Sequence, residues 1–209
     1  MPVDVALYPV NLIVAGRRCL VVGGGPVAAR KAGGLLDCGA VVHVVARRVG
    51  DGVRALGGAT FEERDYRRGD VAGYRLVITA TGVPEVDAAV ASDAEAEGLW
   101  VNSADDPANC TFTLPAVLRR GPVMVTVSTG GHSPALASWL RERLAAEIGP
   151  EYEVLAGLLS AERDAVRAEG RSTEGMDWRS ALESDMLDLI RSGHVQQAKE
   201  RLQACLSSS

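Results

Sequence analysis

The sequence predicts an α/β fold, a doubly wound parallel sheet followed by a small α+β region and a C-terminal helical region. Short apolar runs alternate with helical patterns through residue 102, as in a parallel sheet covered by helices on both faces. After residue 112 the pattern changes to two strands, and then to helices only. We therefore expect three parts, over residues 1–112, 113–149 and 150–209.

The elements follow from apolar periodicity. Residues 19–22, 40–46, 59–62, 76–80 and 99–102 read as strands, the third at an edge, with helices after Pro26 and over 84–97. Residues 111–114 and 123–128 read as two further strands joined through 115–122. A helix is expected over 135–148, and the chain from Pro150 reads as helical with a break over 168–175.

The first strand runs directly into three glycines. Read as Gly23-x-Gly25-x-x-Ala28, the turn matches the dinucleotide fingerprint of a Rossmann-like fold with alanine in the last place. Gly23 permits the sharp turn, Gly25 lets a pyrophosphate approach the backbone, and Ala28 lets the helix pack closely. The pyrophosphate would face the first N–H groups of the helix. A tight turn without a ligand is the alternative.

The acidic residue that usually follows the second strand of such a site is absent. The strand ends in Ala46, Arg47 and Arg48, and the next acid is Asp51. Two arginines here can receive the 2′-phosphate of NADP, or they can be a solvated strand end. The residues alone leave NAD and NADP open.

Asp105 and Asp106 lie just past the carboxyl end of a predicted parallel strand, the edge at which ligands bind in such sheets. A carboxylate at this edge can act as a general base or bind a cation. The alternative is a solvated Asx-turn that includes Pro107.

A loop rich in glycine and hydroxyl groups leads into the helix expected at 135–148. It contains Ser128, Thr129, Gly130, Gly131 and His132. Its backbone N–H groups can bind an anion, or the loop can simply cap the helix through Ser133. His43 reads as a packed strand residue and His194 as a surface or capping residue, so no metal site is expected.

Composition limits the classes of function. The net charge of −5 gives no global basic footprint for nucleic acid, so an anionic ligand must meet local cations, with Arg119, Arg120 and Arg141 as candidates. No apolar run is long enough for a membrane span, and the first residues do not form a secretory signal. The four scattered cysteines suggest reduced thiols, with Cys19 and Cys38 as packing residues, and a cytoplasmic protein.

Several stretches together resemble one family, the precorrin-2 dehydrogenases, over about residues 8–150. They are GGGPVAARK at 23–31, ATGVPEVD at 80–87, VNSAD at 101–105, CTF at 110–112 and STGGHSPALA at 128–137. The resemblance implies NAD-dependent oxidation of precorrin-2, a carboxylate-rich tetrapyrrole, to sirohydrochlorin by a homodimer whose dimerisation region follows residue 112. No methyltransferase-sized segment follows, so we expect the free-standing form rather than half of a siroheme synthase.

The resemblance also implies site residues. The aspartate of the pattern Val-Asn-x-x-Asp falls on Asp105. Cofactor contacts fall on the residues Gly23, Gly24, Gly25, Pro26, Val27, Ala28, Arg47, Arg48 and Thr81. For a substrate of this class, our own candidate contacts are Asn102 and the residues Ser128, Thr129, Gly130, Gly131 and His132.

The family's usual asparagine after Pro-Glu-Val is Asp87 here, and a serine of its glycine loop is Thr129. Some members also insert Fe²⁺ into sirohydrochlorin, so a bifunctional dehydrogenase and ferrochelatase is one alternative. A nucleotide-sensing module without catalysis is another, because such modules share the glycine turn.

Overall fold

The computed structural model describes residues 5–104 and 106–207. The chain forms two compact units. The first runs to Leu114 and includes Gly130–Ser133, and the second comprises Pro115–Thr129 and the chain from Pro134 onward.

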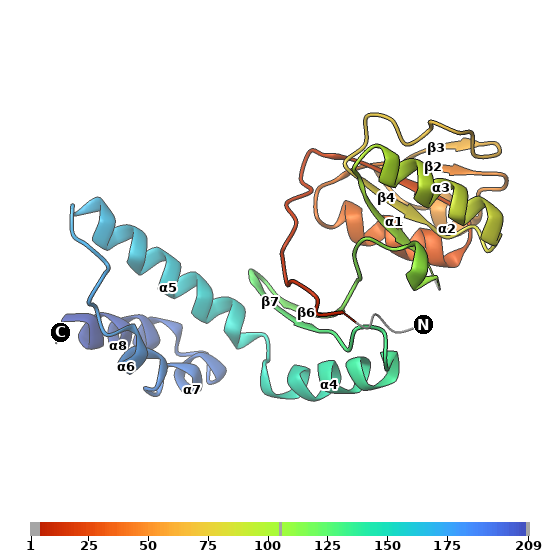
Figure 1. Cartoon of the computed structure of the whole chain (residues 1–209). Helices are drawn as coiled ribbons and strands as arrows, with labels where there is room; N and C mark the ends of the chain where they lie inside the picture. The colour runs from red at the N-terminus through yellow and green to blue at the C-terminus, as the bar shows by residue number, and fades with distance from the viewer. Residues whose placement is uncertain (1–4, 105, 208–209) are drawn as a thin grey trace. The chain divides into compact units, whose positions relative to one another are not determined.

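The first unit contains a five-stranded parallel sheet (Figure 1). Its strands are β1 (Arg18–Val22), β2 (Val41–Ala46), β3 (Thr60–Glu63), β4 (Leu76–Thr79) and β5 (Trp100–Ser103), in the order β3-β2-β1-β4-β5. The central strand β1 has β2 on one side and β4 on the other, so the chain winds outward in both directions. The predicted doubly wound parallel sheet is therefore confirmed, with β3 at one edge as expected.

Helices cover both faces of this sheet. They are α1 (Pro26–Leu36), α2 (Asp51–Arg54) and α3 (Pro84–Ala96). Cys19 and Val21 of β1 pack with α1 and α2, whereas Leu20 and Val22 pack with α3. This alternation follows from the two-residue period of a strand, and it explains why β1 is apolar throughout. Cys19 is fully buried, as expected of a packing residue.

The prediction of a strand at 111–114 is wrong. Thr111 lies beside β5, where its N–H donates to the carbonyl oxygen of Val101 at 2.8 Å and its hydroxyl accepts from the Val101 N–H at 2.8 Å. The hairpin instead consists of β6 (Ala116–Arg120) and β7 (Val123–Val127), which pair antiparallel. Gly121, at φ 53°, permits a two-residue turn, so the expected linker 115–122 contains β6.

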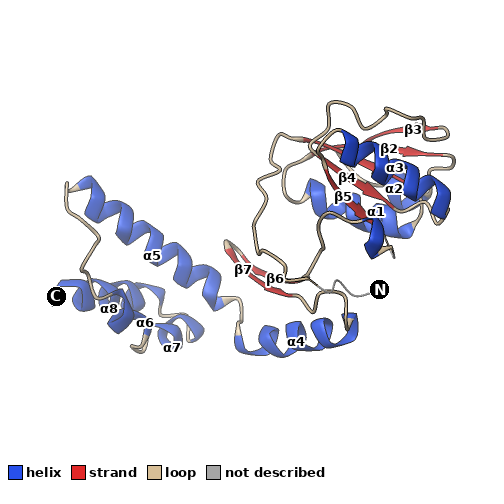
Figure 2. Cartoon of the chain, in the orientation of Figure 1, coloured by secondary structure: helices blue, strands red, loops and turns tan. Residues whose placement is uncertain are grey.

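The second unit continues as helices (Figure 2). These are α4 (Pro134–Glu147), α5 (Glu151–Ala168), α6 (Trp178–Leu182), α7 (Met186–Arg191) and α8 (Val195–Ser207). The last four share a separate apolar core that includes Leu155, Ala181, Met186 and Leu202. The predicted break is confirmed, because α5 ends at Ala168 and α6 begins at Trp178.

Candidate functional site

The three glycines after β1 serve different purposes. A Cβ at Gly23, which has φ 129°, would lie 2.3 Å from the carbonyl oxygen of Ala80 after β4. A Cβ at Gly24 would lie 2.0 Å from the carbonyl oxygen of Arg48 after β2. A Cβ at Gly25 would meet nothing within 4 Å. The first two glycines therefore let the turn pack against its neighbours, and the third leaves open space beside the backbone.

Helix α1 begins at this open space. Gly25 is its N-cap in an extended conformation, no side chain caps the helix, and Pro26 occupies the first turn. The first intrahelical bond runs from the Ala29 N–H to the Gly25 carbonyl at 3.0 Å, so the N–H groups of Val27 and Ala28 have no partner within the helix. The positive end of the helix dipole lies at the same place. This arrangement fits a pyrophosphate, with space at Gly25 and donors at Val27 and Ala28.

The residues at the start of α1 divide between core and surface. Ala28 is fully buried in the core between α1 and the sheet, Val27 is half-buried and Pro26 is exposed. The small side chain of Ala28 thus lets α1 lie close to the sheet.

The turn after β4 lies against the glycine turn and is organised by Asp87 of α3. Oδ1 of Asp87 accepts hydrogen bonds from the Thr81 N–H at 3.2 Å, from the Thr81 hydroxyl at 2.8 Å and from the hydroxyl of Thr79. Asp87 is only 6% exposed. Thr81 therefore holds the turn together, and its backbone N lies 3.3 Å from the position of a Cβ at Gly23.

Asn102 at the end of β5 is buried and fixes the segment that follows. Its Nδ2 donates to the Phe112 carbonyl at 3.0 Å and to the Cys110 sulfur at 3.5 Å, and its Oδ1 accepts from Lys31 Nζ at 3.4 Å. The thiol of Cys110 is also enclosed by the backbone of Ser103, and burial raises its pKa. The amide of Asn102 thus ties β5 to α1 and to residues 110–112.

Of the two adjacent aspartates after β5, the structure describes Asp106. Asp106 caps a short 3-10 helix, η1 (Pro107–Asn109), and its Oδ2 accepts from Asn109 Nδ2 at 2.6 Å. Among the described residues, no backbone N–H bonds to the Asp106 side chain, so the structure does not show the solvated Asx-turn that the sequence leaves as the alternative. Asp105 lies outside the described residues.

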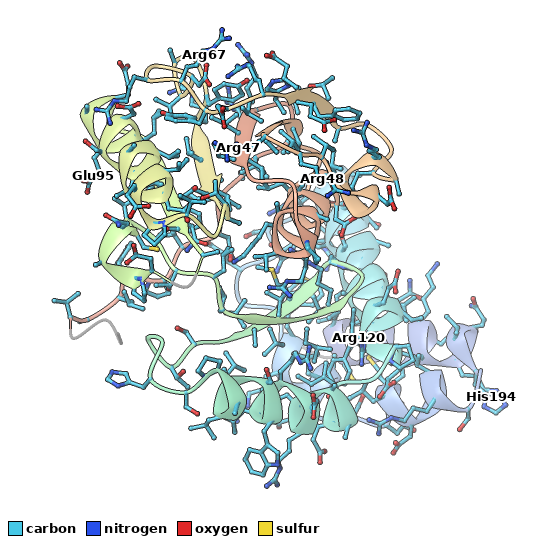
Figure 3. The ribbon with its side chains drawn as sticks, turned by 90° about the vertical axis from the view of Figure 1, so that its right-hand side faces the viewer. Arg47, Arg48, Arg67, Glu95, Arg120 and His194 are labelled. Atoms are coloured by element: carbon cyan, nitrogen blue, oxygen red, sulfur yellow. The ribbon has the colours of Figure 1, made fainter. Side chains whose placement is uncertain are left out.

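Arg47 and Arg48 follow β2 directly and are both exposed (Figure 3). Arg47 Nε donates to Oδ1 of Asp65 at 2.8 Å, in an ion pair whose side chains are 84% and 70% exposed. Among the described residues, no carboxylate pairs with Arg48. The backbone of Arg48 lies against Gly24, so the chain that leaves β2 passes beside the glycine turn.

The hydroxyl-rich loop lies between β7 and α4, with Gly130 and Gly131 at positive φ and His132 exposed. Ser128 and Thr129 belong to the second unit, whereas Gly130–Ser133 belong to the first.

The candidate cations differ in their surroundings. Arg120 uses all three of its nitrogens on backbone carbonyls, at 2.9 Å to Ile148, 3.4 Å to Ala145 and 3.0 Å to Arg119, and so caps the end of α4. Arg141 pairs with Glu142 at 2.9 Å. Of the three, Arg120 is thus held in a structural role.

The histidines behave as packing and surface groups. His43 contacts Thr60 through Nδ1 at 2.8 Å and Glu62 through Nε2 at 3.3 Å, and His194 is exposed. Within the part of the chain that the structure describes, no three His, Cys, Asp or Glu side chains are grouped to hold a metal ion. The helices described here include none that is both long enough and apolar enough to span a membrane.

Sequence reasoning missed two acidic residues beside this edge of the sheet. In the sequence, Asp87 stands out only because the family usually has asparagine there. An acid in the first turn of a helix that follows two threonines nevertheless predicts hydrogen bonds from those threonines. Asp65 follows β3, and its proximity to Arg47 depends on the pairing of β2 with β3, which the sequence does not reveal.

The comparisons with known proteins agree with this geometry. Residues 10–116 match the family described as putative NAD(P)-binding, and residues 120–147 match the family described as the central part of sirohaem biosynthesis proteins. The siroheme synthase of Pseudomonas entomophila (strain L48) is 40% identical over 200 residues, and that of Chromobacterium violaceum is 37% identical over 203 residues. These cover 93% and 94% of this chain but 43% of each relative, so the chain spans less than half the length of these curated relatives.

A solved structure of SirC, a precorrin-2 dehydrogenase, is also similar. It superposes with a TM-score of 0.69 at 25% identity, covering 95% of this chain and 98% of that one. The chain therefore belongs to the putative NAD(P)-binding family, continues into the central region of sirohaem biosynthesis proteins, and shares the architecture of a precorrin-2 dehydrogenase.

Proposed function

We propose that this protein is an NAD-dependent precorrin-2 dehydrogenase, which oxidises precorrin-2 to sirohydrochlorin in the biosynthesis of siroheme and related tetrapyrroles. The observation that carries the proposal is the similarity to SirC over 95% of this chain, with a TM-score of 0.69. A match limited to the sheet would support a nucleotide-binding fold and nothing more. This one extends through the hairpin and the helices, which a nucleotide-sensing module does not need.

The glycine turn supports the nicotinamide part of the proposal. The open space at Gly25 and the N–H groups of Val27 and Ala28 would receive the pyrophosphate, with Gly23 and Gly24 keeping the turn in shape. When bound, NAD supplies an acceptor for hydride. The remaining proposed cofactor contacts are Pro26, Arg47, Arg48 and Thr81. These four residues are compatible with either NAD or NADP.

The oxidation of precorrin-2 removes a hydride and a proton. In this proposal Asp105 takes the proton, because it matches the family's aspartate and comes two residues after the end of β5 in the sequence. Asn102 supports this segment by holding β5 against residues 110–112. Ser128, Thr129, Gly130, Gly131 and His132 would bind substrate carboxylates through backbone N–H groups and hydroxyls.

We further propose that the enzyme is a cytoplasmic homodimer. The support is the family resemblance, which implies dimer contacts after residue 112, and the four free cysteines, which suit a reducing compartment. In this view residues 1–112 bind NAD, 113–149 form the dimer contacts and 150–209 form a helical domain.

An anaerobic assay tests the function. The purified chain is supplied with precorrin-2 and with NAD or NADP in turn, and sirohydrochlorin is followed by its absorption. We expect sirohydrochlorin to form only when NAD or NADP is present. Binding of NAD without any product would favour the sensing module.

The same assay separates the bifunctional alternative. Sirohydrochlorin and Fe²⁺ without NAD would yield siroheme faster than the uncatalysed background only if the chain also inserts iron. Asp105→Asn is expected to bind NAD normally while losing turnover, and normal turnover in that variant would remove Asp105 from the catalytic role.

A further inference from the structure

The acidic residue that usually follows the second strand is absent after β2, but Asp65 follows the neighbouring strand β3. In dinucleotide-binding sheets an acidic residue at the end of the second strand binds the adenosine ribose hydroxyls and disfavours the 2′-phosphate of NADP. Here that position is Arg47. Its guanidinium holds the carboxylate of Asp65, which follows β3, with 2.8 Å between Nε and Oδ1.

The pairing of β2 with β3 brings these residues to one edge. Ala46 is in register with Glu63, and the Arg64 N–H donates to the Ala46 carbonyl at 2.8 Å, so the two strands end together. The chain after β2 also contacts the glycine turn, because the Gly50 N–H donates to the Gly24 carbonyl at 3.0 Å. Asp65 thus pairs with the residue that stands in the sequence where the usual acid would follow β2.

The other acids of this edge are less well placed. Glu63 is held by Arg54, and Glu62 and Asp70 are held by Arg64. Asp51 is exposed in the first turn of α2, four residues beyond Arg47. Only Asp65 pairs with the residue that directly follows β2, among the described residues.

From this arrangement we infer that Asp65, positioned by Arg47, is the residue that selects NAD over NADP. The inference rests on the proposed function, and it concerns this same cofactor site. The carboxylate accepts hydrogen bonds from ribose hydroxyls and repels a 2′-phosphate. The pair is exposed, so its own contribution to stability is small and its effect lies in binding. Without the Asp65 charge, Arg47 becomes free to attract the 2′-phosphate beside Arg48.

Binding of NADH and NADPH to the full chain, measured by calorimetry or nicotinamide fluorescence without precorrin-2, tests the inference. The wild type is expected to bind NADH more tightly. Asp65→Asn removes the charge and keeps the shape, and it should shift the affinity ratio toward NADPH by about tenfold, the size of one charge-assisted hydrogen bond at an exposed site. Arg47→Ala removes the cation that positions the Asp65 carboxylate, so it should weaken NADH binding and lower the preference for NADH.

Two further variants serve as comparisons. Glu183→Gln removes an exposed ion-pair acid from α6 and should leave the ratio unchanged. Asp51→Asn tests the rival acid. An unchanged ratio in Asp65→Asn, or a shift in Asp51→Asn instead, would overturn the inference alone. A wild type that binds neither dinucleotide would overturn the proposed function and the inference together.

Discussion

The backbone of Gly24 packs directly on that of Arg48, so closely that a Cβ at Gly24 would come within 2.0 Å of the Arg48 carbonyl oxygen. This contact joins the turn after β1 to the chain that leaves β2. A Cβ at the neighbouring Gly25 would have no atom within 4 Å. The two adjacent glycines are therefore required for different reasons, one for the fold and one for the ligand.

Gly24→Ala should destabilise the protein, because the new methyl group forces the two backbone segments apart at a cost of about 1–3 kcal/mol. Gly25→Ala should leave the melting temperature almost unchanged, because Gly25 has φ −84° and ψ −175°, which alanine adopts without strain. It should instead weaken NADH binding on the order of tenfold or more, since its methyl group fills the space kept for the pyrophosphate. Thermal unfolding and NADH titration of both variants check this contrast. Unchanged NADH affinity in Gly25→Ala would argue against a pyrophosphate at this turn.

Asn102→Ala should lower the free energy of unfolding by about 1–3 kcal/mol, because the carbonyl of Phe112 and the amine of Lys31 lose a partner in a half-buried setting. Urea unfolding measures the change. Asn109→Ala is not a fair comparison, since the half-buried Asn109 side chain bonds to Asp106. Gln196→Ala on α8 is a better control, because the hydrogen bond from its side chain to Glu200 is exposed.

Arg120→Ala should destabilise the helical unit by about 1–2 kcal/mol, because α4 loses the donors at its last carbonyls. Arg120→Lys should recover only part of this loss, since an ammonium cannot reproduce the fork of three donors. NADH affinity should be unchanged in both. Unfolding curves and NADH titrations distinguish this capping role from a role in cofactor binding.

The stability of the protein should fall at alkaline pH because of Cys19. Burial raises the pKa of this thiol from 9.0 to about 11. The unfolded chain therefore loses the proton first, so the stabilisation is complete below pH 9 and is lost as the pH rises toward 11. The slope from this group is at most about 1.4 kcal/mol per pH unit. Cys19→Ala should show a shallower decline between these values, and an identical decline in both proteins would contradict the assignment.

Much of the first unit could be predicted from the sequence. The sequence predicts all five strands of the sheet, α1 and α3, because buried parallel strands are nearly continuous apolar runs and each of the two helices begins at a proline. In the hairpin, the second predicted strand coincides with β7, whereas the first was predicted at 111–114 and lies at Ala116–Arg120. The Thr111 N–H donates to the carbonyl of Val101 in β5, ten residues earlier in the sequence. No local sequence pattern distinguishes this single hydrogen bond from those of a β-strand.

The candidate site was predictable only in part. The glycine turn is a local motif, so its residues were found directly. Asp65 bonds to Arg47, 18 residues away in the sequence, and Asp87 bonds to Thr79, eight residues away. Neither pair forms a recognisable sequence motif. Arg120 was expected among the candidate cations for the substrate, but its guanidinium caps α4, a role that depends on the packing of β6 with that helix.

The most direct test of the account is the stoichiometry of an anaerobic reaction with precorrin-2 and limiting NAD. Loss of a hydride and a proton from the substrate should yield one NADH for each sirohydrochlorin formed, and Gly25→Ala should require more NAD to reach the same rate. Formation of sirohydrochlorin without a matching amount of NADH, or no formation beyond the rate without enzyme, would contradict it.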